Sequence, residues 1–302
     1  LLEPQSTNLI PYSEDFSQWD TIGSPTIISN YGISPDGTQN ADRVQMNNGD
    51  RLFESNPTPN VSFSVYAKSN SGLNHTISMR DGGSVVSQNI VVTSEWQRFH
   101  IYLNTAMSNV QFRAFEDNID VLFWGAQAEA LPYATSYIPT SGAIATRLAD
   151  SVTGAGDVNT FNSTEGVLYA EIKLGQSNSS SRYIGFSNGG TSNRIIFGAA
   201  GGSVDTINWF IGSGSQVGGN ATGVDFSIFN KIALKYSENN VALWINGVKV
   251  GTNLSVSMPT GLNTLDFNQG GGTGNDFFGK LKVLAVFNEA LTDAELLCLT
   301  TI

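Results

Sequence analysis

Cysteine is almost absent from this chain of 302 residues. The single cysteine, Cys298, cannot form an intrachain disulfide, so a disulfide framework and a multi-cysteine zinc site are both excluded. Histidine is nearly as scarce, and His75 and His100 fall in separate predicted strands. Two histidines exclude a three-histidine zinc site and argue against a histidine-based catalytic triad. The stability of the folded chain must therefore come from packing.

Charged residues are also few, at 14%, and acidic residues outnumber basic ones to give a formal net charge of −11. A field of that sign repels phosphate backbones and anionic lipids, unless a local patch reverses it. We therefore expect no nucleic-acid or membrane-surface partner, and a neutral ligand fits better. Long apolar runs are absent too: the longest, such as Val283–Phe287, are strand-sized and far short of the roughly 18 residues that span a bilayer.

Turn-forming residues, by contrast, are abundant, with 32 glycines in a chain that is 40% hydrophobic. This mixture is typical of a turn-rich all-β protein. Between Asn8 and Pro139, short runs such as Val61–Ala67 and Arg98–Leu103 alternate apolar and polar residues, which predicts half-buried strands. Strands of this length and spacing indicate a β-sandwich or jelly roll.

A second set of strands follows, and the length of the chain allows two cores of about 150 residues each. Residues 140–156 lack periodicity, so we place the boundary near Arg147 and predict domains at 1–146 and 147–302. Asn246-Gly247 predicts a hairpin with a type I′ turn. The capping box Thr292–Glu295 predicts one short C-terminal helix. The second strands are expected at 166–174, 182–187, 194–199, 207–211, 230–237, 241–245 and 280–287.

Framework residues in both halves are similar to those of known families. The first half resembles the carbohydrate-binding-module-type jelly rolls of phage structural proteins, on TNLIPYSEDFSQW (7–19), FSVYAK (63–68), EWQRF (95–99), WGAQ (124–127) and YATSYIPT (133–140). The second resembles concanavalin A-like, laminin-G-type lectin domains, on KIALKY (231–236), LWING (243–247) and FGKLKVLAVFNEALT (278–292). The resemblance implies two tandem antiparallel β-sandwiches, a jelly roll and then a laminin-G-like domain.

The same resemblance implies a phage tail-fibre or other virion-surface protein that contacts host-surface glycans. Its further partners would be other virion proteins, and a homo-oligomer such as a trimer is expected. The predicted function is therefore non-catalytic adhesion on a virion surface or outside a cell. Since fold does not fix function, two alternatives stay open. One is a structural decoration or fibre component held by protein contacts, and the other is a secreted polysaccharide-degrading enzyme or its binding appendage.

Motifs for catalysis are incomplete. Gly185–Gly189 has the Gly-x-Ser-x-Gly pattern around Ser187, but another predicted strand follows it where a hydrolase needs a helix. Gly274–Lys280 has the spacing of a phosphate loop but lacks the Ser or Thr that must follow the lysine. Glu165 and Glu171 are acids of predicted strands, and solvent-facing acids on a sheet are commoner than catalytic pairs. We predict no catalytic residue and no cofactor.

Whether a metal is bound stays open at this stage. In related jelly rolls, an acidic residue just after the first strand's phenylalanine helps to hold a structural calcium, but here Ser17 follows Phe16. Glu14, Asp15 and Asp42 remain candidate oxygen ligands, although nothing in their spacing demands a metal.

A sugar-binding site needs aromatic faces for sugar C–H groups, and amide, guanidinium or carboxylate groups for hydroxyls. Trp19, Trp96, Trp124 and Trp244 lie in or near period-two runs and are interpreted as core residues. Residues near predicted turns are the better ligand candidates. They are Tyr31, His75, Arg80 and Asp81 in the first domain, and Arg182, Asn193, Arg194, Trp209, Asn275 and Asp276 in the second.

Overall fold

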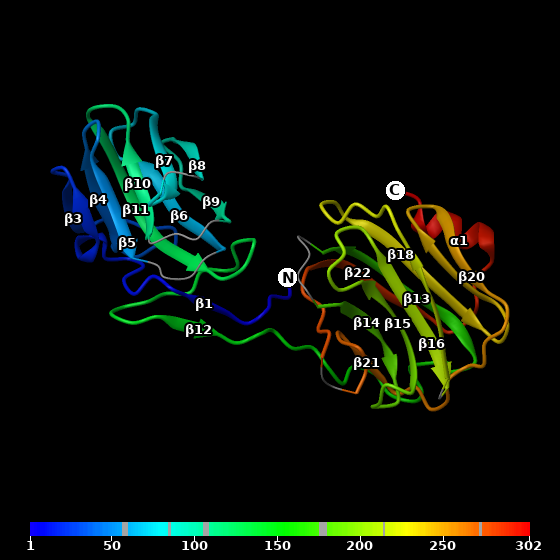
Figure 1. The fold of residues 1–302 in the computed structure, drawn as a ribbon. Coiled ribbons are helices and arrows are strands. Elements are labelled where there is room, and N and C mark those ends of the chain that lie inside the picture. The colour runs from blue at the N-terminus through cyan, green and yellow to red at the C-terminus, as the bar shows by residue number, and fades with distance from the viewer. Residues whose placement is uncertain (56–59, 84–85, 105–108, 175–179, 214, 272–273) are drawn as a thin grey trace. The chain divides into compact units, whose positions relative to one another are not determined.

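The computed structural model describes residues 1–55, 60–83, 86–104, 109–174, 180–213, 215–271 and 274–302, and its strands form two β-sandwich units (Figure 1). The first unit is Gln5–Ala149, and the second is Leu1–Pro4 together with Asp150–Ile302. The predicted all-β fold class is confirmed. The first four residues belong to the second unit because Leu2 and Gly279 exchange two backbone hydrogen bonds of 2.9 Å.

The first unit packs two five-stranded antiparallel sheets face to face. Their orders are β2-β5-β10-β7-β8 and β3-β4-β11-β6-β9, so the chain crosses repeatedly between sheets, as in a jelly roll. A third, short pair joins β1 and β12. The elements are β1 (Ser6–Asn8), the 3-10 helix η1 (Phe16–Gln18), β2 (Asp20–Ile22), β3 (Thr26–Gly32), β4 (Ala41–Met46), β5 (Arg51–Ser55), β6 (Val61–Ser69), β7 (His75–Asp81), β8 (Ser87–Val92), β9 (Gln97–Leu103), β10 (Asn109–Ala114), β11 (Ile119–Glu129) and β12 (Ala145–Arg147).

Aromatic rings fill the middle of the first sandwich. Phe112 of β10 stacks on Phe123 of β11 with ring centroids 4.6 Å apart, and it also contacts Phe63, Phe16 and Trp19. All five lie in the buried cluster of this unit. The period-two pattern explains the arrangement, because alternate residues of each strand point between the sheets.

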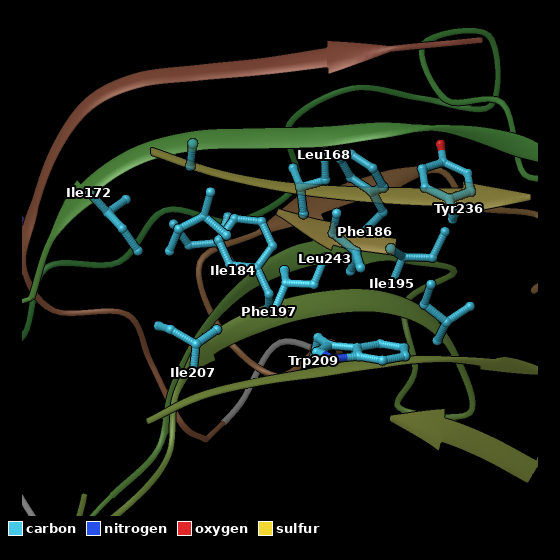
Figure 2. Packing of buried hydrophobic residues seen from close by; sticks show 14 of the residues in the cluster. Leu168, Ile172, Ile184, Phe186, Ile195, Phe197, Ile207, Trp209, Tyr236 and Leu243 are labelled. Atoms are coloured by element: carbon cyan, nitrogen blue, oxygen red, sulfur yellow. The ribbon is translucent and has the colours of Figure 1, made fainter. Parts of the chain in front are cut away.

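The second unit also consists of two five-stranded antiparallel sheets, ordered β20-β19-β18-β13-β22 and β17-β16-β15-β14-β21. Leucine, isoleucine and phenylalanine side chains from both sheets meet between them, with Trp209 lying flat at one side (Figure 2). The elements are β13 (Glu165–Lys173), β14 (Arg182–Ser187), β15 (Asn193–Ala199), β16 (Ile207–Ser213), β17 (Ser215–Ala221), β18 (Asn230–Ser237), β19 (Val241–Ile245), β20 (Val248–Asn253), β21 (Thr264–Asp266), β22 (Lys280–Phe287) and the helix α1 (Asp293–Thr300).

Two local predictions for this unit are confirmed. Asn246 and Gly247, both at positive φ (50° and 79°), connect β19 to β20 as a type I′ turn requires. Thr292 caps α1 with a complete capping box, in which its hydroxyl accepts from the Glu295 N–H and the Glu295 carboxylate accepts from the Thr292 N–H. The helix covers the outer side of β18 and β19 through the buried Leu296. No helix in the described part of the chain is long and apolar enough to cross a membrane.

Candidate functional site

The outer face of sheet β17-β16-β15-β14-β21 combines one arginine with two aromatic rings. Because Ile195 and Trp209 point into the core, their neighbours Arg194 and Phe210 point outward. The Arg194 guanidinium lies 5.8 Å from the centroid of the Phe210 ring. The Tyr183 ring meets Phe210 edge-on, with 6.0 Å between centroids and 82° between planes. We call Tyr183, Arg194 and Phe210 together the Phe210 surface.

Glycines lie opposite both aromatic residues of the Phe210 surface, so no side chain of the paired residue stands beside either ring. Gly218 lies directly opposite Phe210 on the neighbouring strand, and Gly198 lies opposite Tyr183. A Cβ atom at Gly218 would lie 2.6 Å from Cδ1 of Phe210, and one at Gly198 would lie 1.8 Å from the carbonyl oxygen of Arg182. Neither position therefore accepts a larger residue without a shift, and no side chain rises beside the two rings at these points.

Two of the predicted ligand residues, Arg194 and Asn275, meet at Gln269. Arg194 Nη1 donates to the Gln269 carbonyl oxygen at 2.5 Å, and Asn275 Nδ2 donates to Gln269 Oε1 at 2.8 Å. The Asn275 carbonyl oxygen accepts from the Tyr183 N–H at 3.1 Å. Burial lowers the pKa of Arg194, yet a guanidinium stays charged at neutral pH. The structure thus brings Arg194 and Asn275 to the Phe210 surface, and the half-buried Asp276 follows in the same segment.

The remaining second-unit candidates lie elsewhere. Arg182 is buried, and its Nη1 donates to the Leu174 carbonyl oxygen at 2.5 Å. Trp209 is 2% exposed and packs in the core, because the alternation of Ile207–Ile211 turns it inward. Both were predicted to lie near turns and within reach of a ligand, but the structure buries both side chains. Asn193 is half-buried at the start of β15.

In the first unit, Tyr31 lies beside a paired arginine. Arg43 stacks 5.0 Å from the Tyr31 ring centroid, and it donates two hydrogen bonds of 2.8 and 2.7 Å to the Asp120 carboxylate. The hydrogen bonds from Arg43 hold the pKa of Asp120 below its usual range. A pocket of about 500 Å³ is lined by Asp120 and by Ser24, Thr26, Gln45, Met46, Asn47, Ser71, Leu73, Asn118 and Ile119.

The other three first-unit candidates all lie on β7. His75 is buried with Nε2 at 2.7 Å from the Ser71 hydroxyl. Arg80 and Asp81 are also buried, and as consecutive strand residues they point to opposite faces of the sheet. The structure therefore does not bring the first-unit candidates into one cluster with Tyr31, which lies on the other sheet.

The two motifs with catalytic spacing lack the context that catalysis needs. Strand β14 ends at Ser187 and the next element is another strand, so no nucleophile elbow forms there. The Ser187 hydroxyl donates to Asp266 Oδ2 at 3.3 Å. Lys280 begins a strand, whereas a phosphate loop opens a helix. Glu171 forms an ion pair of 2.7 Å with Lys282 of the neighbouring strand β22 in the same sheet.

Among the described residues, no group of three or more His, Cys, Asp and Glu side chains is placed to hold a metal ion. The three acids considered for calcium serve loops instead. Asp42 is buried and accepts from the N–H groups of Phe16 and Asn30, both at 2.8 Å. Asp15 caps η1, and Glu14 accepts from the Tyr137 hydroxyl at 2.8 Å.

Asp42 provides a testable pH dependence. Burial raises its pKa from 3.8 to about 6, and Asp15 and Glu14 add to the shift. An acid with a raised folded-state pKa opposes folding when ionised, so this cost is absent below about pH 4 and complete above about pH 6. We expect the Asp42 contribution to raise the free energy of unfolding by about 2–3 kcal/mol as the pH falls from 7 to 4.

The measurement is a ¹³C-detected carboxyl titration of the folded protein, in which the Asp42 resonance should show a midpoint near 6. Asp36 is the internal control, because hydrogen bonds from Ser34 and Thr38 lower its pKa to about 2. An Asp42 midpoint below about 4 would contradict the assignment.

Comparison with known proteins gives one family match, which lies in the second unit. Residues 149–297 match a laminin-G family model described as the concanavalin A-like lectin/glucanases superfamily. No curated protein matches the chain. Among solved structures, the carbohydrate-binding module CBM40 of the Ruminococcus gnavus IT-sialidase is similar at 16% identity, covering 51% of this chain and 97% of its own, with a TM-score of 0.40. The LG4-5 domains of the mouse laminin α1 chain are similar at 8% identity, covering 83% and 91%, with a TM-score of 0.33.

Proposed function

We propose that this protein binds carbohydrate through the Phe210 surface and catalyses no reaction. The contact between the Arg194 guanidinium and the Phe210 ring, with Tyr183 at the ring edge, carries the proposal. Aromatic rings contact the apolar C–H groups of a sugar, while guanidinium and amide groups donate hydrogen bonds to its hydroxyls. The match of residues 149–297 to the lectin/glucanases superfamily supports carbohydrate as the ligand.

The setting that fits this activity is adhesion to host-surface glycan, on a virion surface or outside a cell. The resemblance of the first unit to phage jelly rolls supports that setting and, with it, other virion proteins as partners. A homo-oligomer such as a trimer would present several copies of the Phe210 surface at once. Multivalent attachment then strengthens weak single-site binding by a factor of about 10²–10⁴ without any new contact.

A glycan array, probed with the chain alone and in a multimerised form, tests the proposal. Phe210→Ala and Arg194→Met should each lower the apparent affinity for the glycans that bind by at least about tenfold, or ~1.4 kcal/mol. Both side chains lie on the outer face, so the fold should survive, as circular dichroism would verify. Tyr102→Ala is the matched control, because Tyr102 is an exposed aromatic residue on a strand of the first unit.

Two results would contradict the proposal in different ways. If neither form of the folded protein bound any glycan on the array, the proposal of glycan binding would be wrong. A structural virion component held by protein contacts would then be favoured. Binding that Phe210→Ala leaves unchanged would remove the Phe210 surface as its site. Chromatography of the bound glycans after incubation tests the non-catalytic part, since any released sugar would show hydrolysis or elimination.

A further inference from the structure

Three arginines gather on the outer face of the other sandwich, on sheet β2-β5-β10-β7-β8. Phe112 of β10 points into the core, and so do the strand residues paired with it on β5 and β7. The adjacent Arg113, Arg51 and Arg80 therefore point outward. Arg113 lies directly opposite Arg51, and Arg80 lies opposite Gln111, so three neighbouring strands each contribute one guanidinium. We call these four residues the arginine face.

The arginine face is not an ordinary solvated surface. Arg80 is only 5% exposed, and Gln111 between the strands is buried as well. Within the described parts of the chain, the buried Nε atoms of Arg51, Arg80 and Arg113 have no hydrogen-bond acceptor. The buried Oε1 of Gln111 likewise has no hydrogen-bond donor there. A buried donor atom without an acceptor is costly.

An arginine on the other sheet of the same unit is paired with a carboxylate, as partly buried arginines usually are. Arg43 donates both arms to the Asp120 carboxylate, and the two pKa values shift in the directions expected of a pair. The chain has 26 acidic residues for 15 basic ones, so acids are not in short supply. Among the residues that the structure describes, no acid forms an ion pair with Arg51, Arg80 or Arg113, which leaves their positive charge for something outside the unit.

The charges near Arg80 reinforce this reading. Burial and the neighbouring guanidinium groups of Arg113 and Arg51 lower the pKa of Arg80. Asp81 raises this pKa, but its effect is the smallest of the four. Asp81 points to the opposite face, where its Oδ1 accepts from the Val86 N–H at 3.4 Å. Like charges opposite one another across strands destabilise a sheet, so an anion placed between them would relieve a repulsion built into the fold.

The acids nearest in the sheet leave the arginines unneutralised. Glu54 of β5 points away from the arginine face, and burial and Asp20 raise its pKa, with no guanidinium among the causes. Asp20 lies exposed on the edge strand β2, opposite Phe53. The centre of the face, around Arg80 and Gln111, is therefore positive in a protein whose net charge is negative.

An aromatic ring stands next to the guanidinium groups. Phe115, just beyond the end of β10, is 48% exposed, and the Arg113 guanidinium lies 4.7 Å from its ring centroid. A ring beside a cluster of fork-shaped donors suits a molecule that carries both an apolar ring face and an oxyanion. A sugar bearing a carboxylate or a sulfate ester has both features.

We propose that the arginine face binds an acidic polysaccharide, with Arg80, Arg113 and Arg51 donating to the sugar oxyanion and Phe115 contacting the sugar ring. The proposal rests on the proposed function only in taking a glycan as the carrier of the anion, since the Phe210 surface lies on the other unit. It also narrows the expectation of a neutral ligand drawn from the net charge, because here a local patch reverses the field.

Binding of the full chain to immobilised polygalacturonate, dextran sulfate and neutral dextran tests this site. The wild-type protein should bind at least one acidic polymer and release it as salt rises, because exposed ion pairs are screened. The polymer that binds identifies carboxylate or sulfate as the preferred group. Arg80→Met should weaken that binding at least tenfold, and Arg113→Gln should weaken it as well. Lys249→Gln removes the same charge from the second unit and should leave it unchanged.

Stability separates a ligand-binding arginine from a structural one. Arg80→Met should leave the urea midpoint of unfolding unchanged or raise it, since the variant removes a buried guanidinium that forms no ion pair and whose Nε has no acceptor. A lower midpoint would overturn the proposal, as would full binding by both arginine variants, binding of duplex DNA as tight as that of the polysaccharide, or no binding of any acidic polymer. Phe210→Ala should retain binding to the acidic polymer, so this proposal and the proposed function can fail separately.

Discussion

Replacing Phe112 by alanine should lower the free energy of unfolding of the first unit by about 3–5 kcal/mol, the usual cost of deleting a buried phenylalanine ring. The Phe112 ring is fully buried and contacts four other aromatic rings, two from the facing sheet and two from η1 and its C-cap. Deleting it removes the transfer free energy of the ring and leaves a cavity that stiff strands cannot fill. Urea unfolding followed by tryptophan fluorescence measures the loss.

Phe115→Ala is the matched control for this prediction. Phe115 lies three residues farther along the chain and is half-exposed, so its loss should change the free energy of unfolding by no more than about 0.5 kcal/mol. Equal effects of the two substitutions would mean that Phe112 does not pack at the centre of the sandwich.

Trp209→Ala should lower the free energy of unfolding of the second unit by about 3–5 kcal/mol. Phe210→Ala, at the next position, should lower it by less than about 1 kcal/mol. Trp209 lies in the core, and its indole fits against Gly219 and Gly251, where a Cβ would come within 3.0 and 3.2 Å of its Nε1. Phe210 points to the other side of the same strand. The pair therefore separates fold from ligand binding at consecutive positions.

Thermal and urea unfolding of both variants, together with the glycan measurement, checks this prediction. Trp209→Ala should lower the unfolding midpoint and affect binding only through the folded fraction. Phe210→Ala should weaken glycan binding and leave the unfolding midpoint nearly unchanged. Loss of binding by Trp209→Ala at a temperature where the variant is fully folded would show that the indole reaches the ligand after all.

Local sequence signals were sufficient for the all-β fold class. Period-two alternation, the Asn246-Gly247 turn and the Thr292 capping box each depend on residues close together in the chain, and the structure contains all three features. The inward placement of Trp209 was also accessible, because the run Ile207–Ile211 has its one polar residue, Asn208, in phase with Phe210. Proximity to a turn was a weaker guide than that phase.

The candidate sites depended on information that a single sequence does not carry. Arg182 is held by backbone carbonyl groups, which leave no trace in the residue pattern. Arg51, Arg113 and Arg80 meet only because β10 lies between β5 and β7, an order set by crossings between sheets. Of these three arginines, the sequence singled out Arg80 alone, for a position near a turn. The Phe210 surface likewise needed the pairing of β14, β15 and β16.

Phage setting, oligomer and ligand identity stay predictions for the same reason. Framework residues of a β-sandwich report how its sheets pack, while the residues that choose a ligand lie on the outer faces. The experiments on Phe210 and Arg80 address those faces directly.

The division of the chain into units has a consequence for the order of folding. In the second unit, the Glu3 N–H donates to the Asp150 carboxylate and the Asp150 N–H donates to the Glu3 carbonyl oxygen, both at 2.9 Å, although the first unit Gln5–Ala149 lies between them in the chain. In an unfolded chain, closing a loop of that size costs about 4 kcal/mol of entropy. Once the first unit has folded, β1 and β12 already hold Ser6 against Arg147. The N-terminal residues then reach the second unit at little further entropic cost, so the earlier-made half of the chain prepares the closure of the later one.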